Sequence, residues 1–294
     1  MGEFLTSGLS LSKAHSAAAR MLRQAGVEAP ELDARLLLCH AAGLSHEDHV
    51  AGLDRALAPD AAARFGAFIE RRLGGEPVSR IIGGREFYGR PFRIDASTLD
   101  PRPDTETLIE AALALIEQDE MHETPLKLLD LGTGSGCILI TLLAELPQAS
   151  GVGIDLSLPA LSLARANAQT LGVGDRASFV ACDWLDATDG TFDLVVANPP
   201  YLSAADMTEL ATEVRDHDPK GALDGGPDGL SAYRRIAPQI HKVLRLGGIA
   251  LFEIGPGQAD AVLHLLAEGG LAVENGRCLW PDLGGRPRVV VARS

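Results

Sequence analysis

A short run of residues, Asn198-Pro199-Pro200-Tyr201, follows an apolar segment and has the chemistry to hold a planar NH2 group. The side-chain oxygen of Asn198 and the backbone carbonyl of Pro199 can each accept one of the two hydrogens. The prolines fix their φ angles and so keep both acceptors in place, and the Tyr201 ring offers a flat face to a planar amide. An amide nitrogen is a poor nucleophile because its lone pair is delocalised. Holding both hydrogens lets the nitrogen twist and localise that pair.

This arrangement predicts methyl transfer from a sulfonium to a nitrogen, promoted by positioning and by electrostatic complementarity to a cationic transition state. It requires neither a metal nor a strong base, since the methylated nitrogen is acidic and loses its proton afterwards. Adenine N6, cytosine N4 and the glutamine side chain all fit, because each presents NH2 on a planar conjugated framework. A proline-rich end to a strand is the alternative interpretation. We predict that the catalytic and substrate-binding residues are Asn198, Pro199, Pro200 and Tyr201.

A glycine loop forms the second candidate site. Residues 130–136 read Asp-Leu-Gly-Thr-Gly-Ser-Gly and lie between a predicted strand and a predicted helix. Glycines in such a loop let the backbone turn sharply and lie directly against a ligand. A dinucleotide fingerprint needs glycine at position 137, which is Cys137 here, and the lysine of a phosphate-binding loop is also absent. The G-x-G-x-G form is instead typical of S-adenosylmethionine sites.

Acidic residues at the next two predicted strand ends support this cofactor. Asp155 has two oxygens for the ribose hydroxyls of an adenosine. Asp183 can accept the adenine amino group, and Trp184 can pack on the adenine face, although core packing is the alternative for this tryptophan. We predict S-adenosyl-L-methionine as cofactor, S-adenosyl-L-homocysteine as product and no metal. The predicted cofactor-binding residues are Asp130, Gly132, Thr133, Gly134, Ser135, Gly136, Asp155, Asp183, Trp184 and Asn198.

An alternation of strands and helices from position 126 onward positions these motifs. Such alternation gives a mostly parallel sheet covered on both faces, and ligands then bind beyond the carboxyl ends of the strands. Every motif above follows a predicted strand. We therefore predict an α/β, Rossmann-like fold with a seven-stranded, mostly parallel sheet. The expected strands are 126–131, 150–155, 177–181, 192–197, 249–254, 271–275 and 288–292, with helices at 138–145, 159–171 and 230–244.

The residues before position 77 have helical periodicity, with prolines and glycines between the segments 11–25, 29–42 and 58–73. A small bundle of four or five helices is expected there. Short apolar runs broken by glycine then predict a β-hairpin within 79–95. Pro103, Asp104 and Thr105 are typical of a helix start. The predicted domains are a helical substrate-recognition domain at 1–77, a hairpin linker at 78–103 and a methyltransferase domain at 104–294.

The charge balance limits the possible partners. The 294 residues contain 26 Lys and Arg against 40 Asp and Glu, a formal net charge of −14. Nucleic-acid binders usually carry a basic face, so duplex DNA is disfavoured, as is an anionic membrane surface. The four cysteines lack C-x-x-C spacing, which favours reduced thiols. With no signal-peptide pattern at the start and no long apolar run, we expect a cytoplasmic monomer that contacts neither membrane nor, directly, nucleic acid.

Taken together, these residues resemble one family, the protein-glutamine N5-methyltransferases of peptide chain release factors, called HemK or PrmC. The resemblance runs from about residue 10 to the end. Besides the glycine loop and the Asn-Pro-Pro-Tyr run, it rests on Glu-Pro-Val-Ser at 76–79, Gly-Arg-Glu-Phe-Tyr-Gly at 84–89, Pro-Arg-Pro-Asp-Thr-Glu at 101–106, the glycine-rich segment 222–230 and Glu253-Ile254-Gly255-x-x-Gln258.

The resemblance implies a class I methyltransferase domain behind a helical N-terminal domain and a hairpin linker. It also implies that the substrate is the glutamine of the Gly-Gly-Gln motif in class-1 release factors, methylated at N5. By the family's pattern, Asn198 and Pro199 bind the target amide and Asp155 binds the ribose. The chain departs from the pattern at Leu99-Asp100 and at His217-Asp218, so the residues that line the substrate differ in detail.

Three other functions stay open. A glutamine N5-methyltransferase of a ribosomal protein shares the Asn-Pro-Pro-Tyr run, but the intact run at 101–106 is associated with the release-factor branch. A nucleic-acid amino-methyltransferase acting on adenine N6 needs a basic groove and a target-recognition domain, which the helical N-terminus does not suggest. A cofactor-binding scaffold without catalysis is disfavoured by the intact Asn-Pro-Pro-Tyr run.

Overall fold

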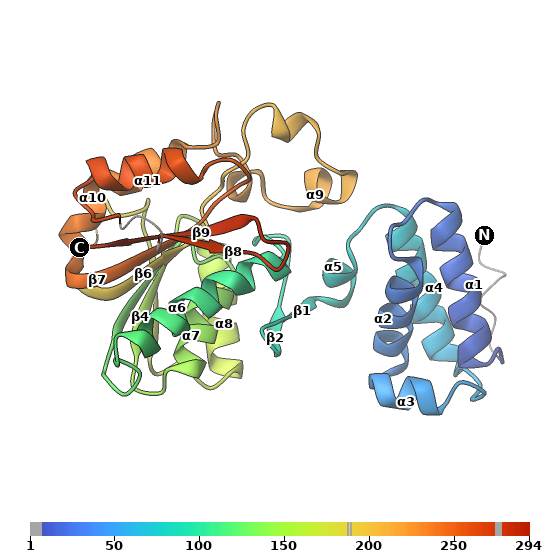
Figure 1. The fold of residues 1–294 in the computed structure, drawn as a ribbon. Helices are drawn as coiled ribbons and strands as arrows, with labels where there is room; N and C mark the ends of the chain where they lie inside the picture. The colour runs from blue at the N-terminus through green and yellow to red at the C-terminus, as the bar shows by residue number, and fades with distance from the viewer. Residues whose placement is uncertain (1–7, 187, 189, 274–277) are drawn as a thin grey trace. The chain divides into compact units, whose positions relative to one another are not determined.

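The chain forms two compact units, Met1–Gly84 and Arg85–Ser294, which are described separately. The structure, a computed structural model, describes residues 8–186, 188, 190–273 and 278–294, without the side chain of residue 46 (Figure 1). No helix within these ranges is long and apolar enough to cross a membrane.

The first unit is helical, as predicted. Its apolar stripes face one another around Leu22, Leu37 and Phe65, which are fully buried. One ion pair lies inside it, between the Arg72 guanidinium and the Asp33 carboxylate at 2.7 Å. The helices within the described residues are α1 (Leu11–Gln24), α2 (Pro30–Ala42), α3 (His46–Ala51), α4 (Pro59–Leu73) and α5 (Val78–Ile82).

A β-hairpin opens the second unit, with strands β1 (Gly84–Phe87) and β2 (Arg90–Arg93). Its two-residue turn places Tyr88 at φ 51° and Gly89 at φ 70°, as expected where two positive φ angles match the twist of the strands. The hairpin was therefore correctly predicted for these residues. The prediction was wrong for the first residues of 79–95, which belong to α5, because Pro77 begins this short helix and Gly83, at φ 73°, ends it.

The domain boundaries at 77 and 103 stay a prediction. Starting the last domain at 104 would leave the hairpin outside it. Asn167 of α8 (Leu158–Thr170), however, bonds both backbone groups of Arg93 in β2, with distances of 3.0 and 3.1 Å. The same amide donates to the backbone carbonyl of Ser135 at 2.9 Å. The Asn167 side chain therefore links the hairpin to the glycine loop.

A seven-stranded sheet forms the centre of the second unit within the described residues, in the order β5-β4-β3-β6-β7-β9-β8. The first five strands in this order are parallel, whereas β9 is antiparallel to both of its neighbours. The predicted mostly parallel α/β sheet is confirmed. The strands are β3 (Lys127–Leu131), β4 (Ser150–Asp155), β5 (Ala177–Ala181), β6 (Phe192–Ala197), β7 (Leu244–Glu253), β8 (Leu279–Pro281) and β9 (Pro287–Arg293).

The strand expected at 271–275 is wrong in its described part, and positions 274 and 275 lie outside the described residues. Ala272 makes only an isolated bridge to Arg293, and the edge strand is β8 instead. Leu271 is nevertheless buried in the core, 4% exposed. An apolar residue that packs from a loop thus produced a strand-like pattern.

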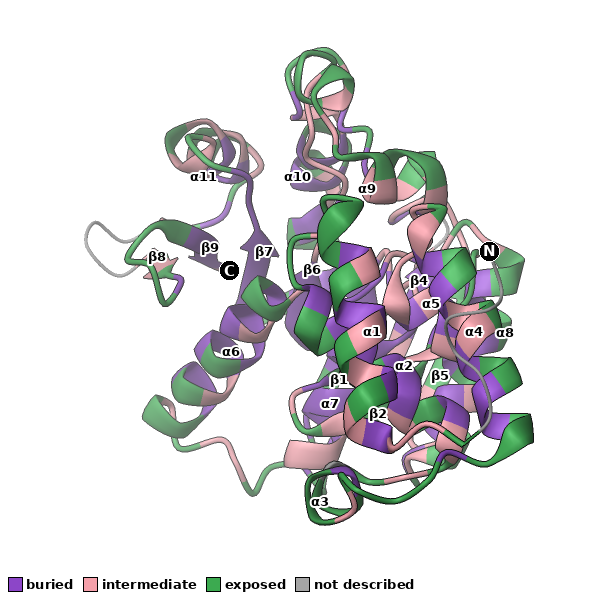
Figure 2. Cartoon of the chain, turned by 90° about the vertical axis from the view of Figure 1, so that its right-hand side faces the viewer, coloured by how far each residue is buried: buried purple, intermediate pink, exposed green. Residues whose placement is uncertain are grey.

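Helices cover both faces of the sheet (Figures 1 and 2). Along β3, Leu128 belongs to one apolar cluster and Leu129 to the other, because successive side chains point to opposite faces. All six residues of β6 are buried, as expected for a central strand covered twice. One cluster includes residues of α6 (Glu106–Gln118), α7 (Cys137–Glu145) and α8, and the other includes residues of α10 (Ser231–Val243) and α11 (Ala259–Glu268).

Candidate active site

The five parallel strands end at one edge of the sheet and bring the predicted motifs together there. Leu131 pairs with Ala197, which in turn pairs with Phe252, so β3, β6 and β7 end side by side. On the other side, Asp155 of β4 pairs with Ala181 of β5. The glycine loop, Asp155 and the Asn-Pro-Pro-Tyr run therefore share one edge, as ligand sites in such sheets do.

The glycine loop bends back over the end of β4. The backbone N–H groups of Gly132 and Thr133 both donate to the Ile154 carbonyl at 2.8 Å. Gly132, Gly134 and Gly136 have φ angles of 73°, 54° and 81°, which side chains rarely adopt. A Cβ atom on Gly134 would meet nothing closer than 4.0 Å. The loop therefore leaves open space beside its backbone at Gly134.

Asp155 ties the end of β4 to this loop. Its Oδ2 accepts a hydrogen bond from the Gly134 N–H at 2.9 Å, and its Oδ1 accepts one from the Ser157 N–H at 2.8 Å. The residue is half-buried. Each carboxylate oxygen has a second lone pair, so the side chain can hold the loop and still accept hydroxyl groups from a ligand.

Asp130 lies behind the loop and is fully buried. Burial raises the pKa of its carboxyl to about 7, partly offset by the hydrogen bond from Thr133. The Thr133 hydroxyl donates to Oδ2 at 2.6 Å, whereas Oδ1 has no hydrogen-bond partner among the described residues. An unpaired buried acceptor is costly, and with 0% exposure the carboxyl supports the loop from behind.

The two residues predicted to contact an adenine have different surroundings. Trp184 adopts φ 54° and is half-buried, and two of its ring atoms lie 3.5 and 3.7 Å from where a Cβ on Gly132 would be. Its ring therefore lies against the glycine loop. Asp183 is half-buried, and its Oδ2 pairs with the Arg235 guanidinium at 2.8 Å. One of its two oxygens is thus already engaged, a contact that the sequence did not suggest.

Together these features fit S-adenosylmethionine. The glycine backbone forms a cradle, and the Asp155 carboxylate can accept ribose hydroxyls. The aromatic ring of Trp184 borders the same cradle. This set therefore matches an adenosyl group better than it matches a pyrophosphate.

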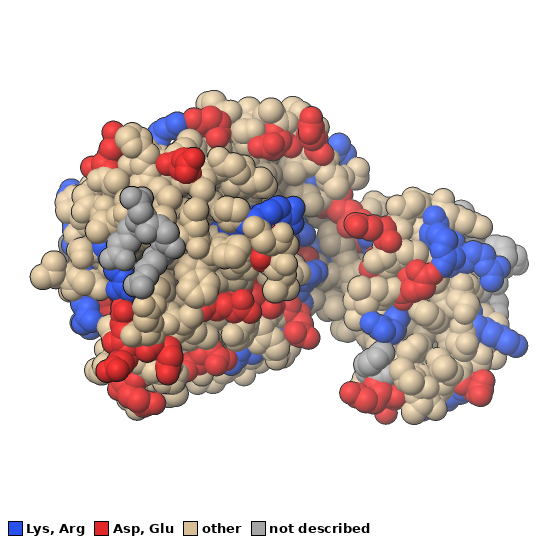
Figure 3. Space-filling model, viewed as in Figure 1, with Lys and Arg blue, Asp and Glu red and all other residues tan. Residues whose placement is uncertain are grey.

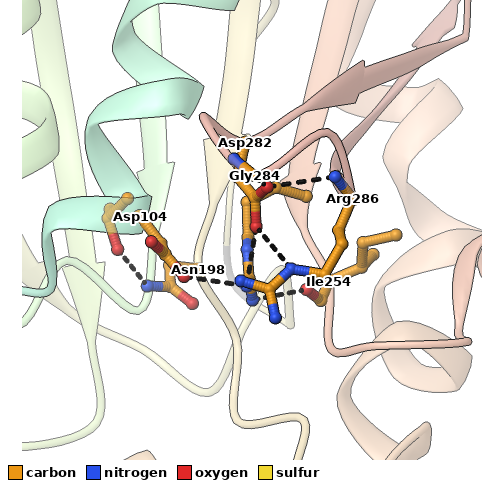
Figure 4. A network of polar contacts seen from close by, with 8 residues as sticks. Asp104, Asn198, Ile254, Asp282, Gly284 and Arg286 are labelled. Carbon is orange, nitrogen blue, oxygen red and sulfur yellow. Dashed lines mark hydrogen bonds and ion pairs between the residues drawn. The ribbon is translucent and has the colours of Figure 1, made fainter.

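Asn198 follows β6 directly and is half-buried. Its Nδ2 donates a hydrogen bond to the hydroxyl of Thr105 at 3.2 Å (Figure 4). Thr105 ends the short 3-10 helix η1 (Pro103–Thr105) and is 2% exposed. Sequence reasoning treated this threonine only as part of a helix start, so its contact with the candidate catalytic residue is new.

Gln258 holds the end of the Asn-Pro-Pro-Tyr run. Its Nε2 donates to the backbone carbonyls of Tyr201 at 2.9 Å and of Gly229 at 3.3 Å. Its Oε1 accepts the N–H of Gly255 at 2.9 Å. The Gln258 amide therefore joins three loops at the strand ends, which gives a structural reason for its place in the resemblance.

Glycines of the segment 222–230 pack directly on the same run. A Cβ on Gly225 would lie 2.8 Å from the Pro200 carbonyl oxygen. A Cβ on Gly229 would lie 2.3 Å from the Tyr201 carbonyl oxygen. Only glycine permits this approach, so the backbone that carries the predicted acceptors is held from behind.

The segment between Leu202 and Asp224 lies outside the sheet. Leu202 and Asp224 form a parallel bridge, and between them lie η2 (Asp206–Thr208), α9 (Thr212–His217) and η3 (Lys220–Ala222) (Figure 1). Asp218, one of the departures from the family pattern, accepts a bond from Arg102 at 2.6 Å. This ion pair links the segment between Leu202 and Asp224 to the run at 101–106.

Glu253 is the last residue of β7, and the end of β7 lies beside the end of β6, which Asn198 follows. From the sequence, Glu253 was assigned no role. It is 1% exposed, and burial raises the pKa of its carboxyl to about 7. Hydrogen bonding from the hydroxyls of Thr105 and Tyr201, and the positive charge of Arg288, offset part of the rise. In the sequence, an acidic residue at the end of an otherwise apolar strand could have indicated that Glu253 is buried next to the site.

Glu253 should make the fold less stable as the pH rises from about 4.5, its ordinary pKa, to about 7, its pKa in the folded chain. Within that window the folded chain keeps a proton that the unfolded chain has released. The free energy of unfolding then falls by up to ~1.4 kcal/mol per pH unit for this group. Below the window both states are protonated, so the contribution is fully present.

Glu253→Gln is uncharged and should flatten this slope, which urea unfolding at several pH values measures. Asp130 also makes the free energy of unfolding fall as the pH rises, because its pKa is raised to about 7. This contribution of Asp130 remains in the Glu253→Gln variant. A slope equal to that of the wild type would mean that Glu253 is ionised in the folded protein.

Two family models match the chain: "PrmC N-terminal domain" over residues 13–83 and "Methyltransferase domain" over residues 122–259. A release factor glutamine methyltransferase of Bradyrhizobium diazoefficiens is 48% identical over 287 residues, covering 98% of this chain and 96% of that protein. One from Rhodospirillum rubrum is 46% identical, covering 98% and 86%. Among solved structures, the hMettl16 catalytic domain in complex with an RNA hairpin has a TM-score of 0.54 at 16% identity, covering 74% of this chain and 81% of that one, which shows a shared fold.

Proposed function

Because the chain belongs to the release factor glutamine methyltransferase family, we propose that it methylates N5 of the glutamine in the Gly-Gly-Gln motif of class-1 release factors, using S-adenosyl-L-methionine. The observation that carries the proposal is the setting of Asn198. It directly follows β6, the strand next to the one that leads into the glycine loop, and its amide is already fixed by a bond to Thr105.

The chain's own residues act by holding the glutamine side chain. Asn198 Oδ1 and the Pro199 carbonyl each accept one hydrogen of the NH2 group, and Tyr201 supports the planar amide. Held from two sides, the nitrogen twists and its lone pair becomes available. When bound, S-adenosyl-L-methionine supplies an electrophilic methyl group on sulfur. The methylated nitrogen then releases its proton to water, so the site needs no metal and no strong base.

The residues that would hold the cofactor line the glycine cradle. Asp155 accepts the ribose hydroxyls, Asp130 supports the loop from behind, and Trp184 borders the adenine. S-adenosyl-L-homocysteine then leaves as the product. The complete proposed set is Asp130, Gly132, Thr133, Gly134, Ser135, Gly136, Asp155, Asp183, Trp184 and Asn198.

Asp155→Ala should weaken cofactor binding by about 1.5–3 kcal/mol, the range for a charge-assisted hydrogen bond. The variant loses the acceptors for the ribose and also the support of the Gly134 N–H. Calorimetric titration with S-adenosyl-L-homocysteine measures the effect. Asp175→Ala is a matched control, because Asp175 is an exposed aspartate that precedes β5, at the opposite end of this strand from Asp183. Equal affinities for the two variants would contradict the assignment.

A protein substrate agrees with the surface charge. On the face seen in Figure 3, the described Lys and Arg side chains are dispersed among Asp and Glu and form no continuous basic patch. A duplex partner would need phosphate contacts from such a patch. A release factor is a cytoplasmic translation factor, so we place the enzyme in the cytoplasm, acting as a monomer.

Incubation with labelled S-adenosyl-L-methionine tests the substrate. We expect label in a purified class-1 release factor, and mass spectrometry should place one added methyl group on the Gly-Gly-Gln glutamine. A release factor with alanine at that glutamine is the control and should stay unlabelled. Label in a ribosomal protein or in RNA, with none in the release factor, would overturn the proposal.

A further inference from the structure

The hydroxyl of Thr105 occupies an unusual position next to the site. It is buried, and it accepts the hydrogen bond from Asn198 Nδ2 at 3.2 Å. Hydrogen bonding from the same hydroxyl lowers the pKa of the Glu253 carboxyl, against the larger rise that burial causes. A hydroxyl has a single hydrogen to donate. When that hydrogen points to the carboxyl, the oxygen can only accept from Asn198.

This direction decides which end of the Asn198 amide faces the substrate. With Nδ2 bound to Thr105, the acceptor Oδ1 is left for an incoming NH2 group. With the amide reversed, Oδ1 would face Thr105, and Nδ2 would meet the substrate NH2 donor against donor. An apolar neighbour would enforce neither orientation, because the two ends of an amide have nearly the same shape.

A charged network fixes the turn that carries Thr105 (Figure 4). The neighbouring Asp104 pairs with the Arg288 guanidinium at 2.8 Å, and Arg288 is itself 7% exposed. Arg288 also contacts Asp282 at 3.3 Å and the Ile254 carbonyl at 3.4 Å. Since Ile254 follows Glu253, the same guanidinium holds both the turn and the strand end. Arg288 thus fixes the neighbours of Thr105 and of Glu253 relative to each other.

We propose that Thr105 is a positioning residue: its hydroxyl accepts a hydrogen bond from Nδ2 of Asn198 and thereby presents Oδ1 to the glutamine amide. The inference rests on the proposed function. It gives the run at 101–106 a chemical role, since the threonine of that run sets the orientation of the first residue of the Asn-Pro-Pro-Tyr run.

Thr105→Val removes the hydroxyl and keeps the shape of the side chain. We expect kcat for release factor methylation to fall about tenfold, as for loss of a buried hydrogen bond, with KM for the release factor unchanged within about twofold. Thr105→Ser should restore most of kcat, because the hydroxyl returns. Thr105→Ala is measured alongside, since it removes the hydroxyl without placing a new methyl group beside Glu253.

Thr107→Val is the matched control, because Thr107 is a buried threonine two positions further along the chain, in the first turn of α6. Its kcat should equal that of the wild type. The dissociation constant of the release factor without cofactor is a readout besides activity, and it should be the same in the Thr105 variants as in the control. The melting temperature of the Val and Ala variants should fall, because a buried hydrogen bond is lost.

The proposal is overturned if both the Val and the Ala variants keep kcat within twofold of the wild type. It is also overturned if the Ser variant is as slow as the Val variant, or if release factor affinity falls in parallel with kcat, since either pattern indicates a merely structural role. Failure of the proposed function would appear differently, as a wild-type enzyme that leaves the release factor unmethylated.

Discussion

Asn198→Ala should lower kcat for release factor methylation by about 10²–10³-fold, the loss expected for one preorganised electrostatic contact in an active site. The variant removes the acceptor for one N–H of the glutamine amide and leaves the Pro199 carbonyl to hold the group alone. The nitrogen can then turn back into conjugation. Single-turnover kinetics with saturating cofactor and release factor measure the effect on the chemical step.

The affinity for S-adenosyl-L-homocysteine separates the two roles proposed for Asn198. We expect it to change little, because the glycine loop and Asp155 keep their mutual hydrogen bond. A variant with weak cofactor binding but nearly normal kcat would assign Asn198 to the cofactor alone. In that case the amide would be held by some other group, and the mechanism would be wrong.

The positions of the motifs were predictable because they depend on local patterns. The apolar run that becomes β6 and the prolines after it predicted a strand end at Asn198, and the glycines predicted a tight turn after β3. Parallel strands then bring such ends to one edge without further information. These rules involve only residues that are close in the sequence, which is why they succeeded.

The partners of the motifs were not predictable from the same patterns. Asn198 and Thr105 are separated by 93 positions, and their contact depends on how η1 packs against the ends of β6 and β7. Glu253 looked like the polar end of a strand, and only its burial sets it apart. The ion pair of Asp183 with Arg235 likewise joins elements 52 positions apart.

Two local errors have a common physical origin. In α5, the chain between Pro77 and Gly83 is too short for helical periodicity to be visible, so its isoleucines suggested a strand. At 271–275, Leu271 is apolar because it enters the core from a loop. In both places the apolar residues indicate that the segment is buried. Burial alone does not distinguish a strand from a short helix or from a loop that packs into the core.

Gly229→Ala should reduce kcat about 10²-fold through displacement of the Asn-Pro-Pro-Tyr run, since small misplacements of reacting groups have effects of this size. The added Cβ would lie 2.3 Å from the Tyr201 carbonyl oxygen and 2.5 Å from Gln258 Nε2. Both belong to the hydrogen bond that holds this run, so neither can move without loosening it. The strain must therefore reach the Pro199 carbonyl, two residues before Tyr201.

Gly172→Ala separates this steric effect from backbone strain. Gly172 has φ 75°, close to the 76° of Gly229, but a Cβ there would meet nothing within 4 Å. Both variants should lose about 1–2 kcal/mol of unfolding free energy to the left-handed backbone conformation, which urea unfolding measures. Only Gly229→Ala should lose more than this and also lose turnover. If the two variants had equal kcat, the packing of segment 222–230 would not be what holds the acceptors in place, and the rigidity of the site would have to come from the prolines and Gln258 alone.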